Sequence, residues 1–414
     1  MVKNIIFMTE FGFSKRDLDR YGFKVLKRRG LIPTVLDISL LTRSGYMPGH
    51  EEPNKNNIDS LITIQNRREL ESYFSNLNVK DLVVCLVETR RENDFIFDIL
   101  NKNSITYGFI FFGELPMFDV LNPLDEWGRA LTAEDQNISL FNFCLALQKK
   151  ITNSLIFINI KRLIKRITFR SEDSIFRPRY VVTSGLNSYK KAKISFVNRS
   201  CVFLRIHSLD YNIALGLQET DIVKDKYAVF LDDNQPYHPD NLIYDTGPNL
   251  ALNKTPEDYY FELNRFFDFF ERATDLKVLI AAHPRSNYSE LSFKPFKERE
   301  LHYGKTIQLI KDSNFVLGHH STSLGSGAIF KKPILLLEST TLGSFNANYV
   351  HMQSRELGVR ILNISMIDQI KGYDFHLPHH PNNCKKYIAK YIKHKDTEEI
   401  NSWDFFVNSL DDLF

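Results

Sequence analysis

Short apolar runs alternate with longer amphipathic stretches along the first part of the chain. The apolar runs have the length of buried strands and lie at residues 5–8, 33–38, 81–87 and 107–112. The amphipathic stretches repeat their apolar positions at helical spacing and cover residues 15–29, which end at Gly30, and residues 93–100. Strands separated by helices of this size form βαβ units, so the pattern predicts a parallel sheet.

The same alternation starts again near residue 225. It predicts strands over residues 227–231, 276–282, 315–317 and 334–337, and helices over residues 256–274, 305–313 and 322–330. Two such arrays predict an α/β protein with two Rossmann-like domains that face a cleft, in which ligands bind at the carboxyl ends of the strands. We expect an N-terminal domain over residues 1–215, a C-terminal domain over residues 216–395 and a last helix over residues 396–414.

Composition is that of a soluble globular protein. Of the 414 residues 43% are hydrophobic, and the net charge of +3 is too small to indicate nucleic acid as a partner. No apolar run approaches the roughly 18 residues of a membrane span, and the first run is too short for an export signal. The four cysteines, at positions 85, 144, 201 and 384, lie far apart, so we expect free thiols and a cytoplasmic protein.

Residues 149–170 are basic and contain no acidic residue. Seven lysines and arginines alternate there with aliphatic side chains. A basic amphipathic helix of this kind can lie on an anionic membrane surface, which would make the protein peripheral on the inner face of the cytoplasmic membrane. The alternative is a helix that connects the domains and exposes its basic residues to water.

Two polar motifs follow predicted strands of the second array. The strand over residues 276–282 runs into His283-Pro284-Arg285, and the strand over residues 315–317 is followed by Ser321-Thr322-Ser323. Because the carboxyl ends of parallel strands share one sheet edge, we expect the two motifs to lie side by side. The alternatives are a plain turn for His-Pro and simple helix capping for the serines.

These residue types suit a nucleotide phosphate. Hydroxyl groups and free backbone N–H groups at a helix start form an anion site, and Arg285 adds a cation. His283 could donate a hydrogen bond to the same phosphate or supply a proton to the leaving group. Glu338, at the end of the strand over residues 334–337, could accept a hydrogen bond from a ribose hydroxyl or could be exposed to water.

His283-Pro284 followed by Ser321-Thr322-Ser323 resembles the HP motif and serine motif of bacterial sialyltransferases and Kdo transferases. The segments 227–338 and 5–36 also look like capsule and surface-polysaccharide biosynthesis proteins. The resemblance implies a GT-B fold, in which a C-terminal helix commonly crosses back to the first domain. It also implies a CMP-linked donor whose phosphate is held by the histidine and the serines.

The resemblance further implies a carboxylate base in a D/E-D/E-G motif. The nearest match is Asp232-Asp233-Asn234, in which Asn234 stands where the motif has glycine. Glu10 and Asp17, after the first strand, are rival carboxylates, because an inverting transfer needs a carboxylate within reach of the acceptor hydroxyl. Asp17 is also an acceptor-side candidate.

Two further acceptor-side candidates lie in one short segment. His207 and Asp210 follow the apolar strand over residues 202–206 and could face the cleft.

The hypothesis from the sequence is therefore a glycosyltransferase that needs neither a metal nor a cofactor. It would move a sugar, such as a nonulosonate or Kdo, from a CMP donor to a surface polysaccharide or a glycolipid acceptor. One alternative keeps the fold and uses a UDP-sugar, as a transferase or as a UDP-GlcNAc 2-epimerase-like enzyme. The other is a non-catalytic GT-B scaffold in polysaccharide assembly. A P-loop ATPase is disfavoured because GxxxxGK[ST] is missing.

Overall fold

The computed structural model describes residues 2–11, 13–42, 60–78, 80–112, 116, 175–196, 200–217, 222–238, 255–369, 372–375 and 381–413. All described helices and strands belong to one compact unit, which comprises Met1–Pro116 and Arg177–Phe414. The predicted basic segment 149–170 lies outside the described residues.

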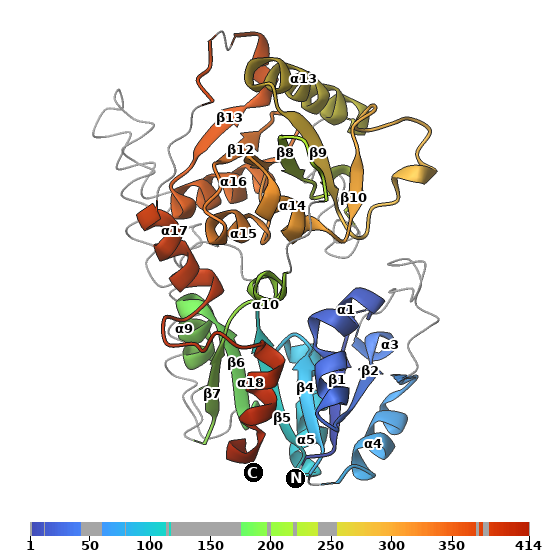
Figure 1. Cartoon of the computed structure of the whole chain (residues 1–414). Coiled ribbons are helices and arrows are strands. Elements are labelled where there is room, and N and C mark those ends of the chain that lie inside the picture. The colour runs from blue at the N-terminus through green and yellow to red at the C-terminus, as the bar shows by residue number, and fades with distance from the viewer. Residues whose placement is uncertain are drawn as a thin grey trace, which may run out of the picture. The chain divides into compact units, whose positions relative to one another are not determined.

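The first sheet has seven strands, all parallel, in the order β3-β2-β1-β4-β5-β6-β7 (Figure 1). The strands are β1 (Asn4–Thr9), β2 (Ile32–Asp37), β3 (Leu61–Thr63), β4 (Leu82–Leu86), β5 (Thr106–Phe111), β6 (Tyr180–Ser184) and β7 (Val202–Ile206). The helical segments between them are α1 (Lys15–Arg20), α2 (Phe23–Arg28), α3 (Ser39–Thr42), α4 (Arg67–Ser75), the 3₁₀ turn Arg91–Asn93, α5 (Asp94–Lys102) and α9 (Gly185–Ser195), and α10 (Leu209–Gly216) follows β7.

The second sheet has six parallel strands in the order β10-β9-β8-β11-β12-β13. They are β8 (Tyr227–Leu231), β9 (Lys277–Ala282), β10 (Leu301–Tyr303), β11 (Phe315–Gly318), β12 (Ile334–Glu338) and β13 (Arg360–Asn363). Its α-helices are α13 (Pro256–Thr274), α14 (Thr306–Asp312), α15 (Leu324–Ile329), α16 (Ser344–Leu357) and α17 (Pro381–Tyr387). Short 3₁₀ segments lie at Gln235–Tyr237, Tyr288–Glu290 and Ile364–Gln369.

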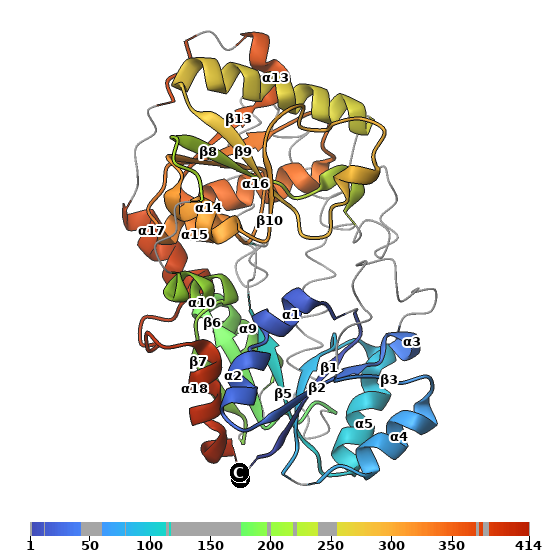
Figure 2. The same ribbon diagram turned by 45° about the vertical axis from the view of Figure 1, so that its right-hand side comes forward.

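Helices cover both faces of the second sheet, as Figure 2 shows. Alternate strand residues such as Phe230 and Ile280 pack against the aromatic face of α13. Their neighbours, such as Val229 and Leu279, pack against α14, α15, α16 and α17. Burial on both faces explains why these strands are continuous apolar runs in the sequence.

The C-terminal segment returns to the first sheet. After α17 come a π-helical turn (Ile388–Ile392), α18 (Ser402–Asn408) and a 3₁₀ turn (Leu410–Leu413). Trp403 and Phe406 of α18 are buried with Phe7 of β1 and Phe23 of α2, and Figure 1 shows α18 beside the first sheet. His207 fixes this segment, because its Nε2 lies 2.7 Å from the Ile400 carbonyl oxygen and its Nδ1 lies 2.9 Å from Ser402 Oγ.

The predicted fold class, two Rossmann-like parallel-sheet units with a C-terminal helix that crosses back, is confirmed. Three predicted helices were wrong in their extent. Residues 15–29 form two helices, because Gly22 adopts a left-handed conformation (φ 67°) between α1 and α2. The helix predicted over residues 322–330 begins only at Leu324, and the helix predicted over residues 396–414 is confined to α18 and a 3₁₀ turn.

Candidate functional site

The predicted motifs of the second sheet end at one edge. His283 follows β9, Asp232 and Asp233 follow β8, and Ser321 lies just beyond β11. The sheet order places β8 between β9 and β11, so the Asp232-Asp233 pair separates the histidine corner from the serines. The expectation that the two motifs are direct neighbours is therefore wrong, because strand β8 lies between the strands that precede them.

Asp232 ties the histidine corner to β8. Its Oδ2 accepts hydrogen bonds from the His283 backbone N–H (2.9 Å) and the Tyr288 hydroxyl (2.6 Å). Its Oδ1 accepts from the Asn234 backbone N–H at 2.9 Å. Both oxygens are thus occupied in a nearly buried side chain. This arrangement suits a residue that positions His283 better than it suits a base.

Asn234 occupies the position at which the related motif has glycine. Its backbone is left-handed, with φ 51° and ψ 35°. Glycine adopts this region without cost, and asparagine is the side-chain-bearing residue most often found there. The substitution therefore keeps the turn that presents the two aspartates.

His283 is neutral in the free protein. Burial lowers the pKa of its imidazole to about 3, and the charges of His238 and Arg285 act in the same direction. Its Nδ1 accepts the Arg285 backbone N–H at 3.3 Å, so the proton resides on Nε2. His283 can therefore donate a hydrogen bond to a phosphate oxygen, whereas the predicted role of an acid does not fit an imidazole that stays neutral at pH 7.

Asp233 has a free carboxylate oxygen. Its Oδ2 accepts from Gln235 Nε2 at 2.8 Å, and His320 Nδ1 lies 3.9 Å from the same oxygen. Its Oδ1 is buried and has no hydrogen-bond partner among the described residues. Of the two adjacent aspartates, Asp233 is the one with a carboxylate oxygen that no described residue contacts by a hydrogen bond.

The serine motif differs from a helix start. α15 has only six residues, and Ser321-Thr322-Ser323 form the turn before it. The Ser321 backbone N–H donates to Gln353 Oε1 (3.0 Å), and the Ser323 N–H donates to Ser321 Oγ (3.2 Å). The amides of Ser321 and Ser323 are therefore used within the protein and are not the free N–H groups that the sequence predicted. The partly exposed side chains are what remains for a ligand.

The rival carboxylates have structural partners. Glu10 is fully buried, and it accepts hydrogen bonds from the Glu88 backbone N–H and from Arg90 Nη2, both at 2.7 Å. Asp17 forms a capping box with Ser14 at the start of α1. Both oxygens of Glu10 are therefore occupied. Asp17 uses Oδ2 for the cap, its Oδ1 lies 3.6 Å from Arg20 Nη1, and its acceptor-side role stays a prediction.

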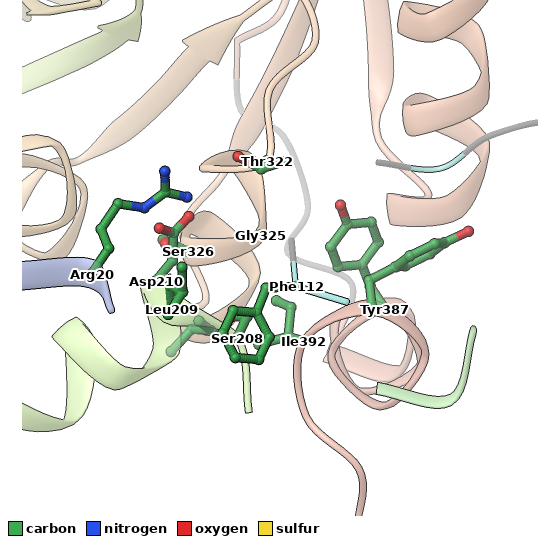
Figure 3. Close-up of a pocket in the computed structure, with 12 residues that line it drawn as sticks. Arg20, Phe112, Ser208, Leu209, Asp210, Thr322, Gly325, Ser326, Tyr387 and Ile392 are labelled. Carbon is green, nitrogen blue, oxygen red and sulfur yellow. The ribbon is translucent and has the colours of Figure 1, made fainter. Parts of the chain in front are cut away.

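His207 and Asp210, which the sequence predicted to share one role, have different surroundings in the structure. His207 is completely buried and holds the C-terminal segment, so its predicted acceptor-side position is wrong. Asp210, in the first turn of α10, lines a pocket with Arg20, Thr322 and Ser326 (Figure 3). Burial raises the pKa of Asp210, while Arg20, Arg16 and a hydrogen bond with Ser323 lower it.

Glu338 has a partner within the protein, and the described residues contain neither a metal cluster nor a membrane-spanning helix. Glu338 ends β12 and pairs with His351 of α16, Oε1 to Nε2 at 3.1 Å, so its contact with a ribose stays a prediction. In the described part of the chain, no cluster of three or more His, Cys, Asp or Glu side chains could hold a metal ion. No helix in that part is long and apolar enough to cross a bilayer.

Tyr288, His320 and Ser326 belong to the site although the sequence analysis did not select them. Tyr288 contacts Asp232, which lies more than fifty residues earlier in the chain. No local pattern reveals such a pair. The sequence shows two consecutive histidines, His319 and His320, at the end of a strand, and the structure gives them different roles. His319 is buried between Tyr259 and the Leu337 carbonyl, whereas His320 faces Asp233.

Asp232 gives a prediction about pH. Burial raises its pKa from 3.8 to about 6, so between pH 4 and 6 the folded protein binds a proton that the unfolded chain does not. Stability from this group therefore increases as the pH falls. From pH 7 to 4, wild type should gain about 2–3 kcal/mol of unfolding free energy relative to Asp232→Asn. Urea denaturation at several pH values measures the difference.

The control for this experiment is Asp225→Asn. Asp225 is exposed, and its ion pair with Lys277 lowers its pKa, so its effect should be small and of opposite sign. Parallel stability curves for Asp232→Asn and wild type would contradict the raised pKa.

Comparisons with known proteins bear on the fold. No family model and no curated protein matches the chain. A structure of the wall teichoic acid polymerase TagF with CDPG is similar over 100% of this chain and 89% of that one, at 12% identity and a TM-score of 0.50.

Two further structures are similar with lower scores. The UDP-GlcNAc 2-epimerase of Methanocaldococcus jannaschii, in complex with UDP-GlcNAc and UDP, matches over 99% of both chains (13% identity, TM-score 0.46). The calicheamicin glycosyltransferase CalG4 matches over 100% of this chain and 97% of that one (12% identity, TM-score 0.44). At such identities the likeness concerns the fold alone, and together with the two parallel sheets it makes this chain a GT-B-like α/β protein.

Proposed function

We propose that the chain is a glycosyltransferase that uses a nucleotide-linked sugar. The proposal depends mainly on one observation, the hydrogen bond from the His283 backbone to Asp232. It fixes the histidine corner at the sheet edge where the hydroxyls of the serine turn also lie, and this edge is where α/β sheets bind ligands. The GT-B-like fold supports the same conclusion.

In this proposal the neutral imidazole of His283 donates a hydrogen bond from Nε2–H to an oxygen of the donor phosphate. The hydroxyls of Ser321, Thr322 and Ser323 would add further donors. Such preorganised donors stabilise the charge that develops on the leaving phosphate. Asp233, through its unpartnered Oδ1, would accept the proton of the acceptor hydroxyl, so that the new glycosidic bond replaces the bond to the phosphate.

The finer form of the proposal is a CMP-linked acidic sugar as the donor and a surface glycan or glycolipid as the acceptor. The resemblance of the HP and serine motifs supports it. We expect CMP and CDP to stabilise the protein against heat more than UMP and UDP do. A nucleotide at a hundred times its Kd adds about 2.7 kcal/mol to the unfolding free energy. Thermal-shift titration of the full chain with the four nucleotides measures this.

The titration also separates the alternatives. Stabilisation by UDP without stabilisation by CMP would reject the CMP donor and favour a UDP-sugar transferase or an epimerase-like enzyme. If none of the four nucleotides stabilises the protein, the enzymatic proposal is wrong, and a scaffold in polysaccharide assembly replaces it.

A further inference from the structure

A pocket beside the serine turn brings Thr322 together with polar groups that the proposed phosphate site does not use. Arg20 of α1, Asp210 of α10, and Thr322 and Ser326 around the start of α15 line it. Figure 3 shows the guanidinium of Arg20 near the Asp210 carboxylate, and the charge of Arg20 lowers the pKa of Asp210. The pocket thus combines an arginine and a carboxylate with hydroxyl groups.

The hydroxyl of Ser326 indicates that the pocket binds a ligand. The Ser326 side chain is completely buried, and its Oγ has no hydrogen-bond partner among the described residues. A buried hydroxyl without a partner costs free energy, which a bound oxygen atom would recover. Because Ser326 lines the pocket, that oxygen would come from a molecule inside it.

The charges around the pocket leave an excess of positive charge. Three arginines and two aspartates interact there, namely Arg16, Arg20, Arg285, Asp17 and Asp210. Burial and the charge of Arg20 lower the pKa of Arg16, as expected where cations crowd together. One added negative charge would balance the group.

We propose that this pocket is a second oxyanion subsite, in which Arg20 and the hydroxyls of Thr322 and Ser326 bind a negatively charged group of the ligand. The inference depends on the proposed function, because Thr322 belongs to the serine turn that would hold the first phosphate. The charged group would therefore be the neighbour of that phosphate. It comes from one of two sources, the second phosphate of a nucleoside diphosphate or the carboxylate of an acidic sugar.

The test compares ligands with and without the additional charge. Dissociation constants of CMP, CDP, UMP, UDP and CMP-N-acetylneuraminate are measured by calorimetry for wild type, Arg20→Met and Ser326→Ala. Lys24→Met is the control, because it removes a positive charge from an exposed side chain of the next helix. The Arg20 carbonyl that accepts from Trp403 Nε1 is part of the backbone, so Arg20→Met keeps it. Ser326→Ala removes an unpartnered hydroxyl and should fold at least as well as wild type.

We expect Arg20→Met to weaken binding of the ligand with the additional charge about ten- to a hundredfold and to leave CMP and UMP within about threefold. A selective loss for CDP or UDP identifies a second phosphate, and a selective loss for CMP-N-acetylneuraminate identifies a carboxylate. Ser326→Ala should show the same selectivity with a smaller loss. If wild type binds nucleotides and neither variant discriminates among them, the subsite is wrong and the proposed function stands. If wild type binds none, the proposed function itself fails.

Discussion

His283→Ala is expected to weaken binding of the nucleotide that stabilises wild type by about ten- to a hundredfold. A hydrogen bond between a neutral donor and a charged phosphate contributes about 1.5–3 kcal/mol, and alanine removes the Nε2 donor entirely. His283→Gln should lose less than tenfold, because its side-chain amide also presents an N–H donor. Titration calorimetry with that nucleotide measures both variants.

The matched control is His302→Ala, since His302 belongs to the edge strand β10 and lies beside Glu300. It should bind as wild type does. The donor is a neutral imidazole, so the affinity of wild type should not follow titration of His283 between pH 6 and 8. Equal affinities for His283→Ala and wild type would remove this histidine from the phosphate site.

Trp403→Ala is expected to lower the unfolding free energy by about 3–5 kcal/mol. The Trp403 ring is 2% exposed, lies 5.7 Å from the Phe7 ring between centroids, and donates from Nε1 to the Arg20 carbonyl at 2.8 Å. Its removal leaves a cavity and an unpaired carbonyl where α18 contacts the first sheet. Urea denaturation measures the loss, and Phe261→Ala, at a side chain 64% exposed, should stay within about 0.5 kcal/mol.

Gly22 offers an independent check on the same contact. A methyl group on Gly22 would overlap the Trp403 side chain, whereas one on Gly30, which has a similar positive φ, would meet open space. Gly30→Ala should therefore cost only the backbone strain of about 1 kcal/mol, and Gly22→Ala distinctly more. In the Trp403→Ala background the two glycine variants should cost the same. A difference that persists there would show that Trp403 does not determine the conformation of this turn.

The fold could be predicted from the sequence where periodicity is strong. Helix α13 begins and ends as expected, and its capping box at Thr255 and its aromatic face explain why the pattern was clear. Strand β10 has only three residues with partly exposed side chains, so it gives no periodic signal and was not predicted. The break at Gly22 was also missed, and the side chain that leaves no room for a Cβ there, Trp403, is distant in the sequence.

The site could be predicted at the level of strand ends but not of hydrogen bonds. The positions of His283 and Asp232 follow from the order of strands and loops. Which aspartate keeps a free oxygen depends on Tyr288, and whether Ser321 offers its amide depends on Gln353 of α16. Both partners come from distant segments that pack against the sheet edge, and pairwise contacts of this kind leave no trace in local composition.

The return of the C-terminal segment also affects how the chain is made. The first sheet is built from β1 to β7, yet Trp403 and Phe406, which complete its core, are translated about 200 residues after β7. Because synthesis proceeds from the N-terminus, a nascent chain that already contains all seven strands still exposes the apolar side chains that Trp403 and Phe406 later cover. The first sheet therefore acquires its final stability only after α18 has left the ribosome.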